Sequence, residues 1–396
     1  MDIRKMFLER EQKTIELRRK LHMWPEYGDQ LPKTQKLVCE ELDRIGISYI
    51  CNHGDSGVIA DISGGKPGKT ILFRADMDAL HLQEEADLDF RSQNPGYMHA
   101  CGHDAHVAML LTAAEVLYEL RDQLHGTVRL VFEAGEEIGT GGIHTKEAGG
   151  LEGVDAVFAL HVGNLAGGSV PSGVFSIVPG PVTAGKDRIT LTVHGKSCHG
   201  AYPQDGVDAL RIAARIVTAL EDLMEHELPQ GMAAVMTFGC MEAGKDNNTI
   251  PDLAVLHGTI RTQSTEDRQW ILQRLESVCK EIPARYGGSC EVVVKKGSNP
   301  VRNDPELSAF VADSVAKIVG PECVQRTFSR PSMGSDDFAW YTAEAPGVYY
   351  FLSTSDAGTV TDEPQHSPKF RIEESALWKG AASLAAVACD YLHFGR

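Results

Sequence analysis

Three apolar runs in the first half of the chain have the length of buried strands. They cover residues 70–78, 127–132 and 154–160, and a helical pattern of apolar positions over residues 105–120 separates the first two. Strands that alternate with helices are typical of an α/β domain whose central sheet is mainly parallel. Helix and strand patterns return after residue 305, so we expect the end of the chain to complete the same domain.

The pattern of apolar and polar positions changes near residue 186. Alternating and helical stretches follow one another there in the order βαββαβ, which predicts a ferredoxin-like unit. A chain of 396 residues is also long for a single core. We therefore expect a catalytic domain in two parts, residues 1–184 and 298–396, interrupted by a smaller domain at residues 185–297.

Polar side chains stand where each of the three apolar runs ends. Asp78 ends the first run, Glu136 and Glu137 follow the second, and His161 follows the third. The carboxyl ends of parallel strands meet at one edge of a sheet, so we expect these side chains to converge. A solvated turn is the alternative for the glutamate pair, but the glycine-rich loop after it would let the carboxylates face a cleft.

Residues 98–106 carry several potential metal ligands just before a predicted helix. A thiolate and neutral imidazoles suit zinc and other divalent transition ions, and Gly102 permits the turn that would place Cys101 and His103 on one ion. A buried free cysteine beside solvated histidines is the alternative. His366, in a proline-bracketed loop near the end of the chain, would by itself be a surface histidine.

Composition excludes several classes of function. The formal net charge of −17 argues against nucleic acid, whose phosphates need clustered lysine and arginine. No stretch approaches the roughly 18 apolar residues of a membrane span, and residues 1–6 open a charged amphipathic helix instead of a signal peptide. The nine cysteines are scattered, without a CxxC pair, as expected of reduced thiols in the cytoplasm.

Together these motifs resemble the metallopeptidase family that groups aminoacylases with related carboxypeptidases and amidohydrolases. The branch that they resemble is that of hippurate hydrolases and other N-acyl-amino-acid amidohydrolases. The resemblance covers nearly the whole chain, and although each motif alone is weak, their common order is specific. The matching motifs lie at residues 74–80, 98–104, 136–137, 161–162, 248–251, 258–261, 333–338 and 366–368.

The resemblance implies a centre of two divalent metal ions, with zinc or manganese expected and cobalt or nickel as alternatives. It also implies that Glu136 is the general base and that Asp78 is a carboxylate that steadies a ligand. The implied metal ligands are Cys101, His103, Glu137, His161 and His366.

The resemblance further implies that the inserted domain is a lid or dimerisation domain of a homodimer or higher homo-oligomer. In similar enzymes the residue matching His199 reaches the active site of a neighbouring subunit and stabilises the oxyanion. Those matching Asn248 and Arg261 hold the substrate carboxylate. Several positions depart from the family's pattern. Gln204 stands where a second histidine is common, Tyr202 is expected to narrow the pocket, Asp336 stands where glutamate is common, and residues 353–356 replace a glycine-containing turn.

We therefore expect metal-dependent hydrolysis of the amide bond of an N-acyl amino acid or a related small-molecule amide. A dipeptidase or aminopeptidase with the same centre is the first alternative. Such an enzyme would need an acidic residue to bind the free α-amine of its substrate, and the sequence does not assign one. A catalytically silent relative that binds a metabolite is the second, and a redox-sensing thiol at Cys101 is the third. Glu136 favours catalysis, because a binding module needs no general base.

Overall fold

The computed structural model describes residues 2–52, 54–163, 170–328 and 332–395, and its contacts divide the chain into two compact units. The predicted boundaries fall after residues 184 and 297, whereas the contacts divide the chain after residues 182 and 300. The larger unit comprises Met1–Val182, Val301–Ser332 and Asp336–Arg396, and the inserted unit comprises Thr183–Pro300 and Met333–Ser335.

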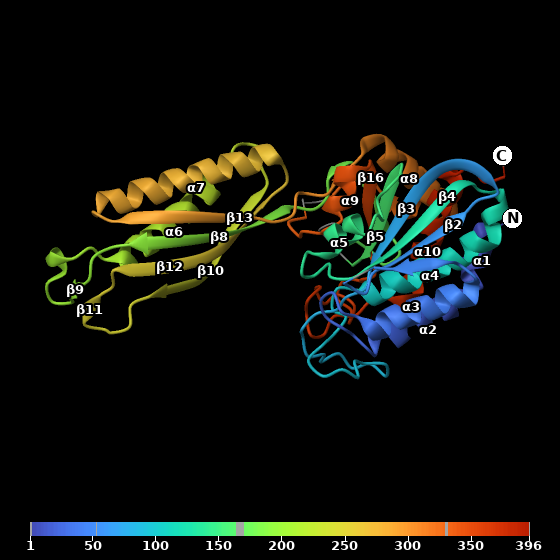
Figure 1. Ribbon diagram of the computed structural model, residues 1–396, viewed down its shortest axis with the longest axis horizontal. Coiled ribbons are helices and arrows are strands. Elements are labelled where there is room, and N and C mark those ends of the chain that lie inside the picture. The colour runs from blue at the N-terminus through green and yellow to red at the C-terminus, as the bar shows by residue number, and fades with distance from the viewer. Residues whose placement is uncertain (1, 53, 164–169, 329–331, 396) are drawn as a thin grey trace. The chain divides into compact units, whose positions relative to one another are not determined.

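The larger unit is built around an eight-stranded sheet. In sheet order its strands are β1 (Tyr49–Cys51), β2 (Val58–Ser63), β4 (His125–Glu133), β3 (Lys66–Asp76), β5 (Ala156–Val162), β16 (Gly347–Leu352), β6 (Phe175–Ser176) and β15 (Val324–Gln325). The four central strands, β4, β3, β5 and β16, are parallel, and antiparallel pairs occur only toward the edges of this sheet (Figure 1). The predicted α/β architecture with a mainly parallel central sheet is confirmed.

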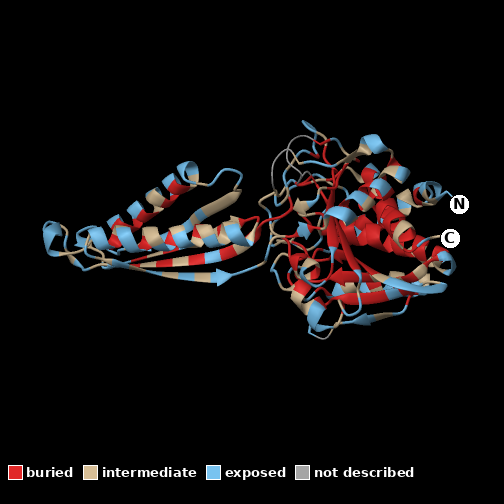
Figure 2. Cartoon of the chain, turned by 90° about the horizontal axis from the view of Figure 1, so that it is seen from above, coloured by how far each residue is buried: buried red, intermediate tan, exposed pale blue. Residues whose placement is uncertain are grey.

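Helices cover the sheet of the larger unit. They are α1 (Ile3–Leu8), α2 (Glu11–His22), α3 (Pro32–Ile45), α4 (His103–Leu120), α5 (Gly141–Glu147), α8 (Pro305–Val319), α9 (Ala339–Glu344) and α10 (Leu377–Tyr391). Because side chains alternate along a strand, Phe73 and Phe158 enter the core that contains α4 and α10, whereas the neighbouring Leu72 and Val157 enter a second core with α9. Buried residues accordingly run through the central strands and α4 (Figure 2).

The inserted unit has the predicted βαββαβ order. Its elements are β8 (Gly185–His194), α6 (Ala209–His226), β10 (Ala234–Ala243), β12 (Leu253–Thr262), α7 (Thr265–Arg285) and β13 (Ser289–Lys296). The sheet order β10-β12-β8-β13, with every neighbouring pair antiparallel, is that of a ferredoxin-like fold. Two short strands, β9 (Cys198–His199) and β11 (Thr249–Ile250), pair beyond this sheet. Within the described part of the chain, no helix is both long and apolar enough for a membrane span.

The start of α4 depends on Gly102. Its φ of 91° lies in the left-handed region, which glycine adopts without a steric penalty. A Cβ atom at this position would lie 2.3 Å from Cγ2 of Val162, so the end of β5 packs directly against the glycine backbone. Because Cys101 precedes Gly102 and His103 follows it, this contact sets where both side chains leave the chain.

Replacing Gly102 with alanine is expected to lower the free energy of unfolding by about 2–4 kcal/mol, because a strained φ and a steric clash act together. Urea denaturation measures this loss. The matched control is Gly96→Ala, since Gly96 has a φ of 83° but no atom within 4 Å of an added Cβ. Equal losses in the two variants would show that contact with Val162 does not constrain Gly102.

Candidate metal centre

Side chains with metal-binding atoms gather where the central strands end and α4 begins. Two groups overlap here, each with ligand atoms that all lie within 4.8 Å of one another. The first includes Cys101 and His366, the second includes His103 and Glu136, and Glu137 belongs to both. The convergence expected from the strand ends therefore brings the predicted base together with predicted ligands.

His103 presents one free nitrogen to this region. Its Nδ1 donates a hydrogen bond to the backbone carbonyl of Asp78 over 2.8 Å, whereas its buried Nε2 has no hydrogen-bond partner among the described residues. Burial disfavours a positive charge on the ring, but the Asp76 carboxylate, 3.7 Å from Nε2, together with Cys101 and Asp78, outweighs it and raises the pKa of His103 well above its usual value. The site therefore favours a cation at Nε2, either a proton or a metal ion.

His161, at the end of β5, is oriented in the same way. Its Nδ1 donates to the carbonyl of Val162 over 2.7 Å, and its Nε2 lies 3.5 Å from Sγ of Cys101. Burial, reinforced by the neighbouring His106, holds the pKa of His161 well below its usual value. A neutral imidazole with a lone pair on Nε2 is the form that binds a metal ion.

The remaining donors come from two loops. Oε1 of Glu137 is buried without a hydrogen-bond partner among the described residues and lies 3.4 Å from Nε2 of His366. His366 has a φ of 64°, unusual for a non-glycine residue, and its backbone N–H donates to the carbonyl of Ala100. Burial, with Glu137 nearby, raises the pKa of the Cys101 thiol to about 12.

Asp78 connects the end of β3 to the glutamate pair. Its two carboxylate oxygens accept hydrogen bonds from the backbone N–H groups of Glu136 and Glu137, over 3.2 and 3.0 Å. The Asp78 carbonyl also accepts the hydrogen bond from His103. Asp78 therefore connects the end of β3 with the start of α4 and with the loop that carries the two glutamates. Burial, followed by the nearby Asp336 carboxylate, raises the pKa of Glu136 well above its usual value.

The donor set fits divalent metal ions. It combines one thiol, imidazoles and carboxylates, the ligands that zinc and similar borderline ions use in proteins. Two of its buried atoms, Nε2 of His103 and Oε1 of Glu137, have no hydrogen-bond partner among the described residues. Both features support a metal centre formed by the predicted residues.

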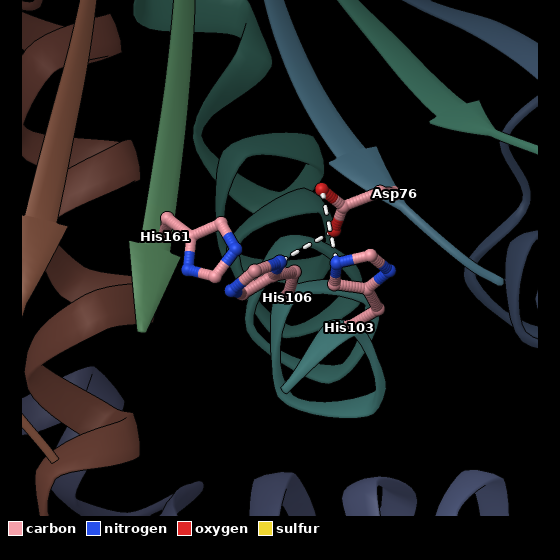
Figure 3. Close-up of side chains that lie close together, drawn as sticks. All are labelled: Asp76, His103, His106 and His161. Carbon is pink, nitrogen blue, oxygen red and sulfur yellow. Dashed lines mark hydrogen bonds and ion pairs between the residues drawn. The ribbon is translucent and has the colours of Figure 1, made fainter. Parts of the chain in front are cut away.

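The structure adds two residues that the predicted ligand set did not include. Asp76 and His106 form a third group with His103 and His161 (Figure 3). His106 lies three residues after His103, on the same face of α4, and this spacing was the available signal. Asp76 ends β3, where a polar residue after an apolar run was equally visible.

A buried network of ion pairs around Arg74 lies next to the centre. Arg74 on β3 donates to Asp76 over 2.5 Å, to Glu133 over 2.6 Å and to Asp337 over 2.8 Å. Asp336 lies beside this network and accepts a hydrogen bond from the hydroxyl of Tyr349 over 2.6 Å. The acids of the network are thus paired with donors from the protein.

His199, Asn248 and Arg261 lie in the inserted unit. The backbone N–H of Ala201 donates to Nδ1 of His199, so a neutral His199 carries its proton on Nε2. The amide nitrogen Nδ2 of Asn248, which is also a donor, lies 3.3 Å from this Nε2. Arg261 donates to the hydroxyl of Ser335 over 3.1 Å, and burial lowers its pKa. The inserted unit thus presents donors suited to an anionic group.

Comparisons with known proteins match almost the entire chain. The family model described as "Peptidase family M20/M25/M40" matches residues 72–390. Thermostable carboxypeptidase 1 of Saccharolobus solfataricus is 37% identical over 382 residues, which covers 95% of this chain and 95% of that protein. N-acetyl-L-cysteine deacetylase of Bacillus subtilis is 35% identical over 371 residues, covering 94% of this chain and 86% of that protein.

A solved structure extends the comparison to three dimensions. The crystal structure of the YXEP protein of Bacillus subtilis, described as a dinuclear metal binding peptidase, superposes with a TM-score of 0.84. It is 32% identical to this chain, and the match covers 97% of this chain and 99% of that one. The chain belongs to the peptidase family M20/M25/M40 and is a metal-dependent amidohydrolase.

Proposed function

We propose that this protein hydrolyses the amide bond of N-acyl amino acids at a centre of two divalent metal ions, with Glu136 as the general base. The observation that carries the proposal is the adjacent pair Glu136 and Glu137. Both backbone N–H groups are fixed by Asp78, which lets one carboxylate join the ligand group while the other handles a proton. The N-acetyl-L-cysteine deacetylase among the relatives supports this substrate class.

We assign the ions to Cys101, His103, Glu137, His161 and His366, and we expect zinc or manganese, with cobalt or nickel as alternatives. When bound, the ions would polarise the scissile carbonyl and acidify the attacking water. Glu136 would accept the proton of that water and transfer it to the leaving amine. One carboxylate can serve both steps, because a base must also give up its proton within one turnover.

The groups of the inserted unit would bind the substrate. Nε2–H of His199 is a donor that can stabilise an oxyanion, a contribution of roughly 3 kcal/mol in comparable sites. Arg261 and Asn248 would hold the substrate carboxylate, since a guanidinium can bind it through two parallel hydrogen bonds. We propose a homodimer or higher homo-oligomer in which the partner subunit's His199 completes each site.

A peptidase acting on short peptides is the second candidate, because a carboxypeptidase is among the relatives. Arg261 would serve it equally well, since a peptide with a free C-terminus carries the same carboxylate. An aminopeptidase would need an acidic anchor for the free amine, and the contacts of the described residues assign none. We place the enzyme in a reducing, cytoplasmic compartment, because all nine cysteines are free thiols.

Chelation is expected to abolish amine release from N-acyl amino acids, and restored zinc, manganese, cobalt or nickel is expected to recover it. The measurement is amine release from a panel that runs from N-acetyl to aromatic acyl amino acids and includes short dipeptides. Turnover of dipeptides alone would move the assignment to the peptidase. Turnover that responds to oxidant but not to chelator would support the thiol-sensor alternative instead.

Replacing Glu136 with glutamine is expected to lower kcat by roughly 10²–10⁴-fold, because the proton acceptor is lost. Metal content by elemental analysis should stay at the wild-type value, since Glu136 is not one of the five residues to which the ions are assigned. Glu147→Gln, an exposed glutamate on α5, is the matched control and should keep full activity. Wild-type turnover by the Glu136 variant would show that another group is the base.

Replacing Arg261 with lysine is expected to raise KM for N-acyl amino acids roughly tenfold to hundredfold, because paired hydrogen bonds to the carboxylate are lost. The same substrates with the carboxylate capped as an amide should lose far less. Arg285→Lys, at an exposed position on α7, serves as the control. An equal rise in KM for free and capped substrates would contradict the assigned contact.

A further inference from the structure

His106 lies among the candidate ligands without offering a nitrogen to a metal ion. Its side chain is buried on α4, three residues after His103, and its ring centroid is 5.4 Å from that of His103 and 4.5 Å from that of His161. Figure 3 shows its ring between these two histidines, with a dashed line from the ring to Asp76. Proximity alone would make it a fourth imidazole ligand.

Both ring nitrogens of His106 are already engaged. The backbone N–H of Val162 donates to Nε2 over 2.8 Å, and Nδ1 lies 2.5 Å from Oδ1 of Asp76. A backbone N–H can only donate, so Nε2 carries a lone pair and the proton of a neutral ring is on Nδ1. Nδ1–H therefore donates to the Asp76 carboxylate, and the ring has no free lone pair.

The neighbouring histidines also donate from Nδ1, but their Nε2 atoms do not accept a backbone hydrogen bond. His103 and His161 each use Nδ1 to donate to a backbone carbonyl, and each leaves Nε2 without a backbone partner. A ligand needs such a lone pair, whereas His106 could bind an ion through Nε2 only after the hydrogen bond from Val162 was broken. Histidines on α4 and β5 thus have two roles. His103 and His161 keep Nε2 available for a metal ion, whereas both ring nitrogens of His106 make hydrogen bonds within the protein.

Val162 lies where three segments that carry candidate ligands meet: the end of β5, the start of α4 and the loop before His366. The Val162 carbonyl accepts from Nδ1 of His161 and from the amide of Gln365, the residue before His366. Its side chain contacts the position where Gly102 lacks a Cβ. By holding the N–H of the same residue, His106 fixes the end of β5 relative to α4.

We propose that His106 is a positioning residue of the metal centre, which clamps Val162 to Asp76 and thereby sets the distance between His161 and the ligands that flank Gly102. This inference rests on the proposed function, because it assumes that the predicted residues bind metal. It assigns to His106 a role in metal affinity without a metal–nitrogen bond.

Three substitutions separate the two hydrogen bonds. His106→Gln places an amide oxygen near Nε2 and keeps an acceptor for Val162, His106→Asn keeps only a donor near Nδ1 for Asp76, and His106→Ala removes both. Titration of the metal-free protein with Co²⁺ against a competing chelator gives stoichiometry and affinity. We expect two ions per chain in every variant, affinity lowered roughly tenfold to hundredfold in the alanine variant, and a smaller loss in the glutamine and asparagine variants, because each keeps one of the two hydrogen bonds of the clamp.

The ring itself supplies a second measurement in the unmodified protein. Nitrogen-15 NMR of histidine-labelled chain should show the Nδ1–H form of His106 both before and after Zn²⁺ is added. The Nε2 signals of His103 and His161 should shift on addition. This readout remains available if the alanine variant fails to fold. His125→Gln, at the first residue of β4, controls for the loss of a histidine in the Co²⁺ titration.

The outcomes separate the inference from the function on which it rests. Loss of one ion in the His106 variants, or a metal-induced shift of its Nε2, would show that it is a ligand and overturn the inference alone. Wild-type affinity in both the alanine and asparagine variants would overturn it as well. Absence of Co²⁺ binding to the wild-type chain would overturn the proposed metal centre and the inference together.

Discussion

One buried guanidinium holds the end of the sheet from which the centre is built. Arg74 pairs with Asp76 on its own strand, with Glu133 on the neighbouring strand and with Asp337 on a distant segment. An unpaired carboxylate at this depth would be prohibitively costly, and breaking a buried pair by removing one partner costs about 3–5 kcal/mol. Several acidic side chains can lie together at the carboxyl edge of the sheet because the positive charge of Arg74 compensates the negative charges of its three partners.

The same edge shows how a protein orients imidazoles for a metal ion. Two histidines at the centre each donate one hydrogen bond from Nδ1 to a backbone carbonyl, which fixes both the ring plane and the nitrogen that faces the site. The carbonyls belong to Asp78 and Val162, residues at the ends of β3 and β5. Ligand geometry is therefore inherited from the sheet, the most rigid part of the larger unit.

The two units separate the proposed tasks. All the candidate metal ligands, and Glu136, belong to the larger unit, where strand ends and α4 hold them. The proposed substrate contacts, His199, Asn248 and Arg261, belong to the ferredoxin-like insertion, where His199 lies on the short strand β9. This division would allow substrate preference to change in one unit while the metal chemistry stays in the other, in keeping with function residing in sites carried by a fold.

The sequence by itself determined the architecture and most of the candidate site. Apolar periodicity is a local property, so the strands, the helices and the βαββαβ insertion could be predicted from it, and the strand ends located Asp78, Glu136, Glu137 and His161. Residue types and the turn at Gly102 already suggested Cys101 as a metal ligand, with a buried free thiol as the alternative. The role of His366 came from the resemblance of ordered motifs, because a histidine in a proline-bracketed loop has no distinctive local pattern.

The tertiary structure decided which nitrogen of each histidine is free and which acids are already paired. His103 and His106 are equivalent in the sequence, on one face of one helix, yet only His106 meets the N–H of Val162, a residue 56 positions away. Arg74 likewise reaches Glu133 across 59 residues and Asp337 across 263. Hydrogen bonds depend on where distant backbone and side-chain groups are placed, and local residue patterns carry no information about that placement.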